Sequence, residues 1–179
     1  MLKSKILFLI IVIIKNINLN TTENLPIINI NDNYNYNSYN IKEINNYISY
    51  LNIPKINLYK GLIDINSIDN YVDKNIQIIN SSNMPDVINS NLILAAHSGN
   101  SNVSFFKDLD KLNIDDNIYI EYDNKNYEYK ITNYYIVEKT GYIDIIRNEN
   151  TNILTLITCI ENTNKQIVFI CEINKITDL

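Results

Sequence analysis

The sequence contains few of the residues that build metal sites and disulfide frameworks, and this shortage excludes two classes of protein. Its two cysteines, Cys159 and Cys171, are too few for a disulfide-stapled scaffold in a chain of this length. With His97 as the only histidine, they also fall short of the roughly four ligands of a structural zinc site. No acidic residues stand at ligand spacing beside them, so we expect no metal and no other cofactor.

Basic residues are also scarce, which argues against nucleic acid as a partner. The formal net charge is −5 and the chain has no cluster of Lys and Arg, whereas a nucleic-acid binder needs a basic surface for its phosphate contacts. Arg147 is the only arginine, so lysine is the expected residue wherever a cation is required. The hydrophobic fraction of 46% is sufficient for a packed core.

The N-terminus has the pattern of a membrane signal. Lys3 and Lys5 precede an apolar run at 6–14, and Lys15 closes it. The run is shorter than the roughly 20 residues of a typical span, which favours a cleaved signal peptide. However, no small-residue cleavage site follows, so we expect residues 1–19 to be an uncleaved single-pass anchor with the remaining chain extracellular. A buried N-terminal strand is the alternative.

The rest of the chain divides into a tether and a folded domain. Residues 20–45 are rich in Asn and Tyr and of low complexity, which predicts a stalk with little packing. The domain at 46–179 reads as mostly β. A short helix is predicted at 41–50, leading into the domain, with one or two helical turns at 64–75 and helical spacing at 105–112. Short apolar or alternating runs predict strands at 48–53, 56–62, 76–79, 91–96, 118–122, 127–132, 134–137, 153–158 and 166–173. Many short strands with little helix indicate a barrel or a sandwich.

Two residues of complementary chemistry stand at predicted strand ends. Cys159 follows the run ILTLIT and precedes a polar loop, and His97 follows LILAA and precedes SGNSN. A thiol nucleophile needs exposure at the edge of rigid structure and a base nearby, and one rim of a barrel offers both. Taken alone, such a histidine is more often a solvated or hydrogen-bonded surface residue, and such a cysteine is more often a small buried hydrophobe.

Four ordered segments resemble the sortase family of cysteine transpeptidases. The signature Thr-Leu-x-Thr-Cys is matched at Thr155–Cys159, and NLILAAHSG at 91–99 resembles the strand that delivers the family's histidine. YLNIPKINLYKGLI at 50–63 resembles the opening pair of strands. The segment 105–122 resembles the helical turn and strand that follow the histidine, with Asp115–Asp116 where the family often has Gly-Asp. The resemblance implies a closed sortase-type β-barrel of about eight short strands with one or two short helices.

The resemblance also implies a reaction. Cys159 is expected to attack a carbonyl in the C-terminal sorting signal of a surface protein and form a thioester, which an amine of a cell-wall precursor or a pilin lysine then resolves. His97 is expected to protonate the leaving amine and deprotonate the incoming one. We expect the neighbouring residues Thr158, Ala96 and Ser98 to contact the substrate.

One position departs from the family pattern. Sortases carry an arginine on the strand after the cysteine, and counting back from Glu172 puts Lys165 at that position. Lysine keeps the charge but offers a point-like donor instead of a planar fork. We expect Lys165 to take the role; the alternatives are that Arg147 reaches the site from the preceding loop, or that the protein is a catalytically impaired sortase-like binding module.

Two further alternatives concern the cysteines. Cys171 lies in an apolar run and is expected to be a buried structural thiol, although a Cys159–Cys171 disulfide across a hairpin is conceivable and would abolish the activity. If Cys159 were merely buried as well, the chain would be an anchored all-β surface protein.

Overall fold

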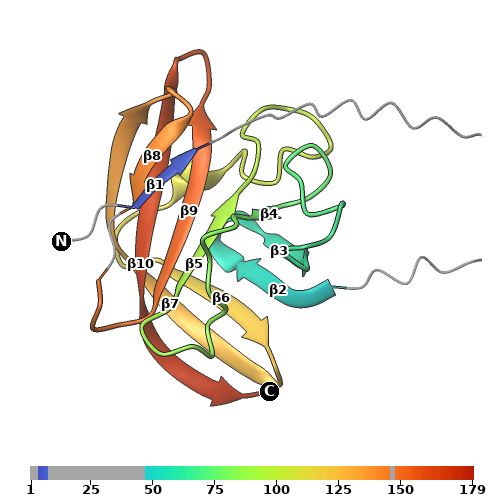
Figure 1. The fold of residues 1–179 in the computed structure, drawn as a ribbon, viewed down its shortest axis with the longest axis vertical. Coiled ribbons are helices and arrows are strands. Elements are labelled where there is room, and N and C mark those ends of the chain that lie inside the picture. Colours follow the sequence, from blue (N-terminus) through green and yellow to red (C-terminus); the bar gives the residue numbers. More distant parts are fainter. Residues whose placement is uncertain (1–3, 8–46, 146–147) are drawn as a thin grey trace, which may run out of the picture. The chain divides into compact units, whose positions relative to one another are not determined.

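The computed structural model describes residues 4–7, 47–145 and 148–179 (Figure 1). The chain divides into two compact units, one made of Met1–Phe8 with Asn46–Leu179 and the other of Leu9–Asn45. The second unit lies outside the described residues, and with it lie the predicted stalk and most of the predicted anchor. Within the described ranges, no helix has the length and apolar character needed to cross a membrane.

Strands account for nearly all of the regular structure. The main sheet has the order β3-β2-β6-β7-β10-β9-β5-β4, and all neighbours are antiparallel except β5 and β9, which run parallel. The elements are β1 (Ser4–Leu7), β2 (Tyr47–Ile53), η1 (Pro54–Ile56), β3 (Leu58–Ile63), β4 (Gln77–Ile78), β5 (Asn91–Ala95), η2 (Leu109–Lys111), β6 (Asn117–Tyr122), β7 (Lys125–Glu138), β8 (Tyr142–Ile145), β9 (Ile153–Ile160) and β10 (Lys165–Asp178).

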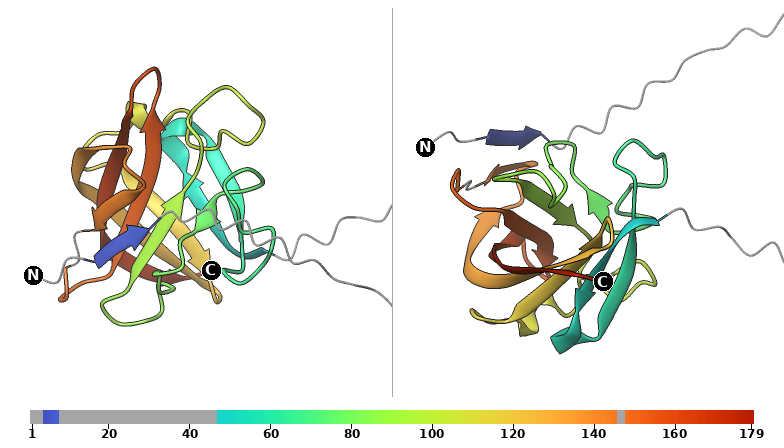
Figure 2. Two further views of the ribbon diagram at one scale, coloured as in Figure 1. Left: turned by 45° about the horizontal axis from the view of Figure 1, so that its top comes forward. Right: turned by 90° about the horizontal axis from the view of Figure 1, so that it is seen from below.

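The main sheet curls into a nearly closed barrel (Figure 2). Its two edge strands, β3 and β4, also contact each other, so little of either edge is left open. The predicted all-β barrel is therefore confirmed. A separate pair consists of β1 and β8, which are antiparallel with Ser4 opposite Ile145. The first residues of the predicted anchor thus form a strand in this structure.

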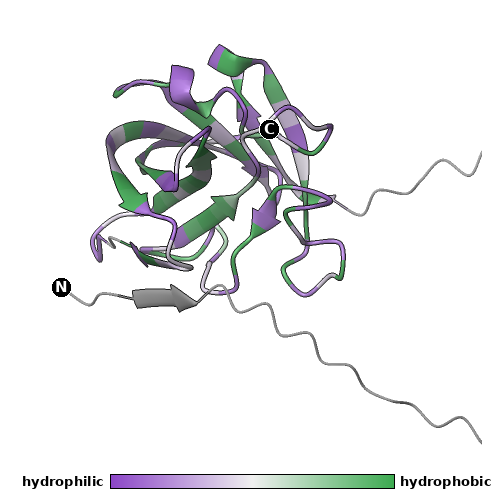
Figure 3. Cartoon of the chain, turned by 90° about the horizontal axis from the view of Figure 1, so that it is seen from above, coloured by the Kyte–Doolittle hydropathy of each residue, from purple (hydrophilic) through white to green (hydrophobic). Residues whose placement is uncertain are grey.

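Alternation along the strands separates two apolar clusters, one on each face of the sheet. Leu154 and Leu156 of β9 lie in the larger cluster, which fills the barrel together with Phe169 and Cys171 of β10. Ile153 and Ile157, on either side of this pair, lie in the smaller cluster on the outer face, which also contains Ile143 and Ile145 of β8. Figure 3 shows the resulting alternation of hydrophobic and hydrophilic residues along the strands. The face on which a residue lies therefore follows from its position in the period of two.

Of the three predicted helical segments, the helix at 41–50 is wrong and the other two contain only short helical turns. In the described part of 41–50, Tyr47–Tyr50 lies in β2, because alternate residues there are buried. The segment 64–75 forms a series of turns, and one of them is a helical turn in which the Asn75 N–H donates to the Tyr71 carbonyl (2.8 Å). Asn70 exchanges hydrogen bonds with the backbone of Ile78 (2.8 and 2.7 Å), which ties these turns to β4.

The segment 105–112 contains only the short 3-10 turn η2. Phe106, Leu109 and Leu112 are nevertheless buried, as their spacing predicted, because they cap one end of the barrel core. The predicted strands at 127–132 and 134–137 are one long strand, β7. It is interrupted by a change of register at Thr132, where two residues of β7 span one step of β10.

A charged turn before β6 explains part of the family resemblance. Asp115 has a φ of 73°, the left-handed region in which glycine is least strained. Asp116 accepts hydrogen bonds of 2.7 Å from the Lys55 ammonium and from the Asn113 N–H. Burial works to raise the pKa of Asp116, but these two hydrogen bonds outweigh it and hold the pKa below its usual range.

This turn makes stability depend on pH. Because the folded pKa of Asp116 lies below the unfolded one, its carboxylate stabilises the fold at neutral pH, and this contribution is lost as the pH falls through the folded pKa. We expect Asp116→Asn to lower the free energy of unfolding at pH 7 by about 1 kcal/mol. Urea titrations at several pH values should show that the difference in the free energy of unfolding between the variant and the wild type becomes smaller at acidic pH.

The neighbouring carboxylate provides the control. Asp115 lies at the surface, 3.9 Å from the Lys130 ammonium, so Asp115→Asn is expected to change little at any pH. Equal pH dependence in both variants would contradict the assignment to Asp116.

Candidate functional site

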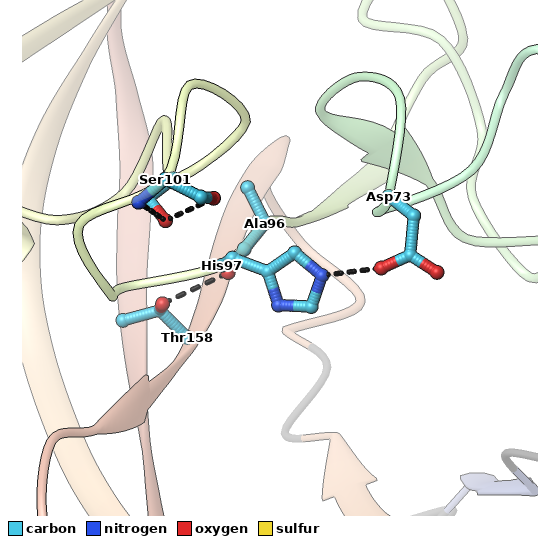
Figure 4. A network of polar contacts seen from close by, with 6 residues as sticks. Asp73, Ala96, His97, Ser101 and Thr158 are labelled. Atoms are coloured by element: carbon cyan, nitrogen blue, oxygen red, sulfur yellow. Dashed lines mark hydrogen bonds and ion pairs between the residues drawn. The ribbon is translucent and has the colours of Figure 1, made fainter.

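The parallel strands β5 and β9 end side by side at one rim of the barrel. Their register runs to the pair Ala95 and Ile157. Beyond it, the Ala96 N–H donates to the Ile157 carbonyl (3.3 Å), and the Thr158 hydroxyl donates to the Ala96 carbonyl (2.8 Å; Figure 4). The two strand ends are therefore held together up to the rim.

This pairing brings the two predicted catalytic residues onto one face. Ala95 and Ile157 both belong to the outer apolar cluster, so their side chains point away from the barrel interior. His97 and Cys159 each stand two residues further along, and the period of two therefore gives them the same outward direction on neighbouring strand ends. Cys159 is partly exposed and its thiol is free. The two residues therefore lie beyond the last pair of one register, and their catalytic roles stay a prediction.

The imidazole of His97 has a partner that sequence reasoning missed. Its Nε2 lies 2.7 Å from the Asp73 Oδ1 (Figure 4). Because a carboxylate only accepts, Nε2 carries the proton in this contact and Nδ1 is left for chemistry. Both side chains are substantially exposed, His97 at 41% and Asp73 at 61%. Asp73 lies in the turns between β3 and β4, and nothing in the local sequence indicates that they return to the histidine.

A cleft of about 470 Å³ opens beside Cys159. One wall comes from the end of β9 and the following turn, with Thr158, Cys159 and Glu161. The other wall comes from the segment after β5, which contributes Ser98 and Asp110 among other polar residues. The cleft thus gives a polar molecule access to the thiol.

The predicted substrate-contacting residues divide into two kinds. Thr158 and Ser98 line the cleft. Ala96 is buried in the barrel core, and its carbonyl is occupied by the Thr158 hydroxyl. Ala96 and Thr158 therefore also hold the two strand ends in register.

The third predicted catalytic residue is not brought to Cys159. In the β9–β10 hairpin, Gln166 lies directly opposite Cys159, and Lys165 lies opposite Ile160. Lys165 therefore points to the other face of the sheet, where its ammonium is 3.9 Å from the Glu138 carboxylate on β7. A register that differs by one residue moves a side chain to the opposite face, and counting along the sequence does not reveal it. Arg147, the other candidate, lies outside the described residues.

Cys171 is the buried structural thiol that its apolar surroundings predicted. It has no exposed surface, lies in the barrel core, and burial raises the pKa of its thiol. Both cysteines are free. The alternative of a Cys159–Cys171 disulfide is wrong, because the two side chains lie on opposite faces of the sheet.

The difference in burial predicts a large difference in reactivity. Iodoacetamide should modify Cys159 in the native protein, whereas Cys171 reacts only after unfolding and therefore at least about a thousandfold more slowly. Mass spectrometry of digests taken over time measures both rates in one sample. Cys159→Ala is the control, in which native labelling should disappear; equally slow labelling of both thiols would contradict an accessible Cys159.

Comparisons with known proteins place this site in context. The sortase domain family matches residues 51–174. Sortase A of Listeria monocytogenes is 23% identical with a TM-score of 0.61, over 74% of this chain and 90% of that one. Sortase C of Streptococcus pneumoniae has a TM-score of 0.65 at 18% identity, over 76% and 74% of the two chains. The D5 sortase of Clostridium perfringens, described as a transpeptidase, has a TM-score of 0.61 at 21% identity, over 72% and 79%. The comparison with curated sequences gave no significant match.

Proposed function

The chain belongs to the sortase family, and we propose that it is an active transpeptidase in which Cys159 is the nucleophile and His97 the acid and base. The observation that supports this most directly is the parallel register of β5 and β9, which ends at Ala95 and Ile157, two residues before His97 and Cys159 respectively, with an open cleft at Cys159. A nucleophile and a base at adjacent ends of rigid strands need little reorganisation to react.

The proposed reaction has two halves. In the first, the Cys159 thiolate attacks the carbonyl carbon of a peptide bond in the sorting signal of a surface protein. A carbon–sulfur bond forms, the carbon–nitrogen bond breaks, and the amine departs with a proton from the His97 imidazolium. In the second half, an acceptor amine attacks the thioester, His97 takes its proton, and the Cys159 thiolate is released.

Asp73 fits this scheme as a positioning residue. Its carboxylate contacts Nε2 of His97 at 2.7 Å. That contact orients the ring and leaves Nδ1 to face the reacting groups. Because the pair is exposed, we expect the effect to be modest compared with that of His97 itself.

The acceptor is proposed to be an amine of a cell-wall precursor or of a pilin. The similar sortase C of Streptococcus pneumoniae has been described in terms of pilin substrate specificity. A lysine ammonium or a peptide amine would approach Cys159 through the cleft, where Asp110 and Glu161 provide negative charge. A panel of acceptors would identify the preferred amine.

We also propose that residues 1–19 attach the chain to a membrane, with the catalytic domain outside the cell. The basic and apolar pattern from Lys3 to Lys15 supports this. Since Ser4–Leu7 cannot pair with β8 and lie in a bilayer at once, membrane insertion requires that the β1–β8 pair opens. Fractionation of cells expressing the full chain tests this; recovery entirely in the soluble fraction would contradict the anchor.

The central test is capture of the acyl-enzyme. The full chain is incubated with sorting-signal peptides, with and without an amine acceptor, and intact-mass spectrometry follows the protein. We expect a thioester on Cys159 that disappears when the amine is added, with the ligated product appearing. Absence of any adduct from the whole panel would overturn the proposal.

A second candidate is a sortase-like module that binds sorting signals without turnover. It is favoured by one observation, that Lys165 lies on the opposite face from Cys159. Peptides that bind in a calorimetric titration and leave no adduct on Cys159 would support this candidate over the enzyme.

A further inference from the structure

Four residues form a row across the outer face of the barrel at the rim. Gln166 of β10 lies directly between Val137 of β7 and Cys159 of β9 in the antiparallel registers. Continuing the parallel register of β5 and β9 by two residues beyond its last pair, Ala95 and Ile157, places His97 next to Cys159. Residues directly opposite each other on antiparallel strands have Cβ atoms about 4.5–5.5 Å apart and point the same way. Cys159 is therefore flanked by His97 on one side and Gln166 on the other.

The chemistry of Gln166 differs from that of its apolar surroundings. The outer face of β10 continues inward from the rim with Val168 and Ile170, both buried in the outer cluster. Gln166 is 9% exposed as a whole residue, so most of its side chain packs against its neighbours. Among the described residues, no hydrogen bond involves its side chain. An amide donor opposite a nucleophile, with no hydrogen-bond partner among the described residues, is available to a reacting group.

Lys165 is less suited to this position, although its charge is attractive. Lys165 lies one position before Gln166 on β10 and faces the opposite side of the sheet. Its cross-strand neighbours there are Ile160 of β9 and Glu138 of β7. Its ammonium is half exposed and lies 3.9 Å from the Glu138 carboxylate. To reach Cys159 it would have to pass from one face of the hairpin to the other, which the alternation of the strand opposes.

We infer that the side-chain amide of Gln166, and not the ammonium of Lys165, donates a hydrogen bond to the oxyanion that forms when Cys159 attacks a carbonyl. This inference rests on Cys159 being the nucleophile of the proposed function. The site then stabilises the developing negative charge with a neutral donor. Such a donor is useful in a site where water is partly excluded and the amide is already in place.

The test separates attack on a carbonyl from other reactions of the same thiol. With p-nitrophenyl acetate, the Cys159 thiolate attacks the ester carbon and the oxygen gains negative charge. The carbon–oxygen bond then breaks, p-nitrophenolate leaves, and an acetyl thioester remains. With iodoacetamide, the thiolate displaces iodide from a saturated carbon and no oxyanion forms. Only the first reaction needs the Gln166 donor.

We therefore expect Gln166→Met, which keeps similar size without an amide, to slow acetylation of Cys159 by about 100-fold. Its alkylation by iodoacetamide should keep the wild-type rate. Lys165→Met, the same kind of change at the adjacent position on the other face, should leave both rates unchanged. The full chain is used throughout, the acetyl group is located by mass spectrometry, and Cys159→Ala supplies the background.

Each other outcome overturns the inference. Acetylation at the wild-type rate in Gln166→Met places the donor elsewhere, and a selective loss in Lys165→Met assigns it to the lysine. Parallel loss of both reactions in Gln166→Met means that the residue acts on the thiol or the fold. In every sample, slow labelling of Cys171 by iodoacetamide shows that the protein is folded. If Gln166→Met loses this protection, Gln166→Leu is used in its place. Since p-nitrophenyl acetate carries no sorting motif, failure of every sorting peptide overturns the proposed function without deciding the donor.

Discussion

Replacing Cys159 by alanine is expected to abolish transpeptidation, with a loss of at least about 10⁴-fold in kcat. Cys159 is the one cysteine of the described residues that reaches the surface, at the end of β9 where the sheet gives way to a turn. Without its sulfur no thioester can form, and neither water nor another side chain at this rim replaces a covalent intermediate. Steady-state ligation of a sorting-signal peptide to an amine measures the loss, and intact mass should show no adduct.

Cys171→Ala is the matched control for this experiment. It removes the other sulfur, from the barrel core, and leaves the rim untouched. We expect a lower stability, by roughly 1 kcal/mol for the small cavity, with the ligation rate retained. If Cys171→Ala removed activity while Cys159→Ala kept it, the assignment of the nucleophile would be wrong.

Replacing His97 by alanine is expected to have the second largest effect, a fall in kcat of about 10²–10⁴-fold. The imidazole stands just beyond the strand end adjacent to that of Cys159. In the proposed reaction it supplies the proton without which an amine leaves poorly. The thioester is still chemically possible, so the loss is smaller than for Cys159→Ala. Single-turnover measurements separate acylation from resolution, and both should be slowed, because His97 acts in each half of the reaction.

Asp73 offers a graded comparison in the same assay. Asp73→Asn keeps a side chain of similar shape, so kcat should fall by about tenfold with KM unchanged, and Asp73→Glu should recover part of it. Asp69→Asn is the control, because Asp69 lies nearby in the chain and pairs with Lys74 at 2.6 Å instead of with the histidine. An equal effect of Asp69→Asn, or a change confined to KM, would contradict a positioning role for Asp73.

Much of the site was predictable because strands obey a short period. Apolar runs that end in polar loops indicated where β5 and β9 stop, and these ends carry His97 and Cys159. The alternation within ILTLITC also fixes that Leu156 and Cys159 face opposite sides. The helix prediction at 41–50 failed for a related reason, since β2 is decided by partners distant in sequence.

The sequence by itself determined the family, the barrel class, and the presence of Cys159 and His97 at strand ends, because these depend on local runs and motifs. Only the tertiary structure decided which neighbours these two residues have. The hairpin register placed Gln166 opposite Cys159 and turned Lys165 to the other face, and the packing of the turns before β4 brought Asp73 to His97. The physical reason is that cross-strand register and loop packing are set by the free energy of the whole barrel. A register shift of one residue hardly alters the local sequence pattern, but it moves every side chain of a strand to the opposite face.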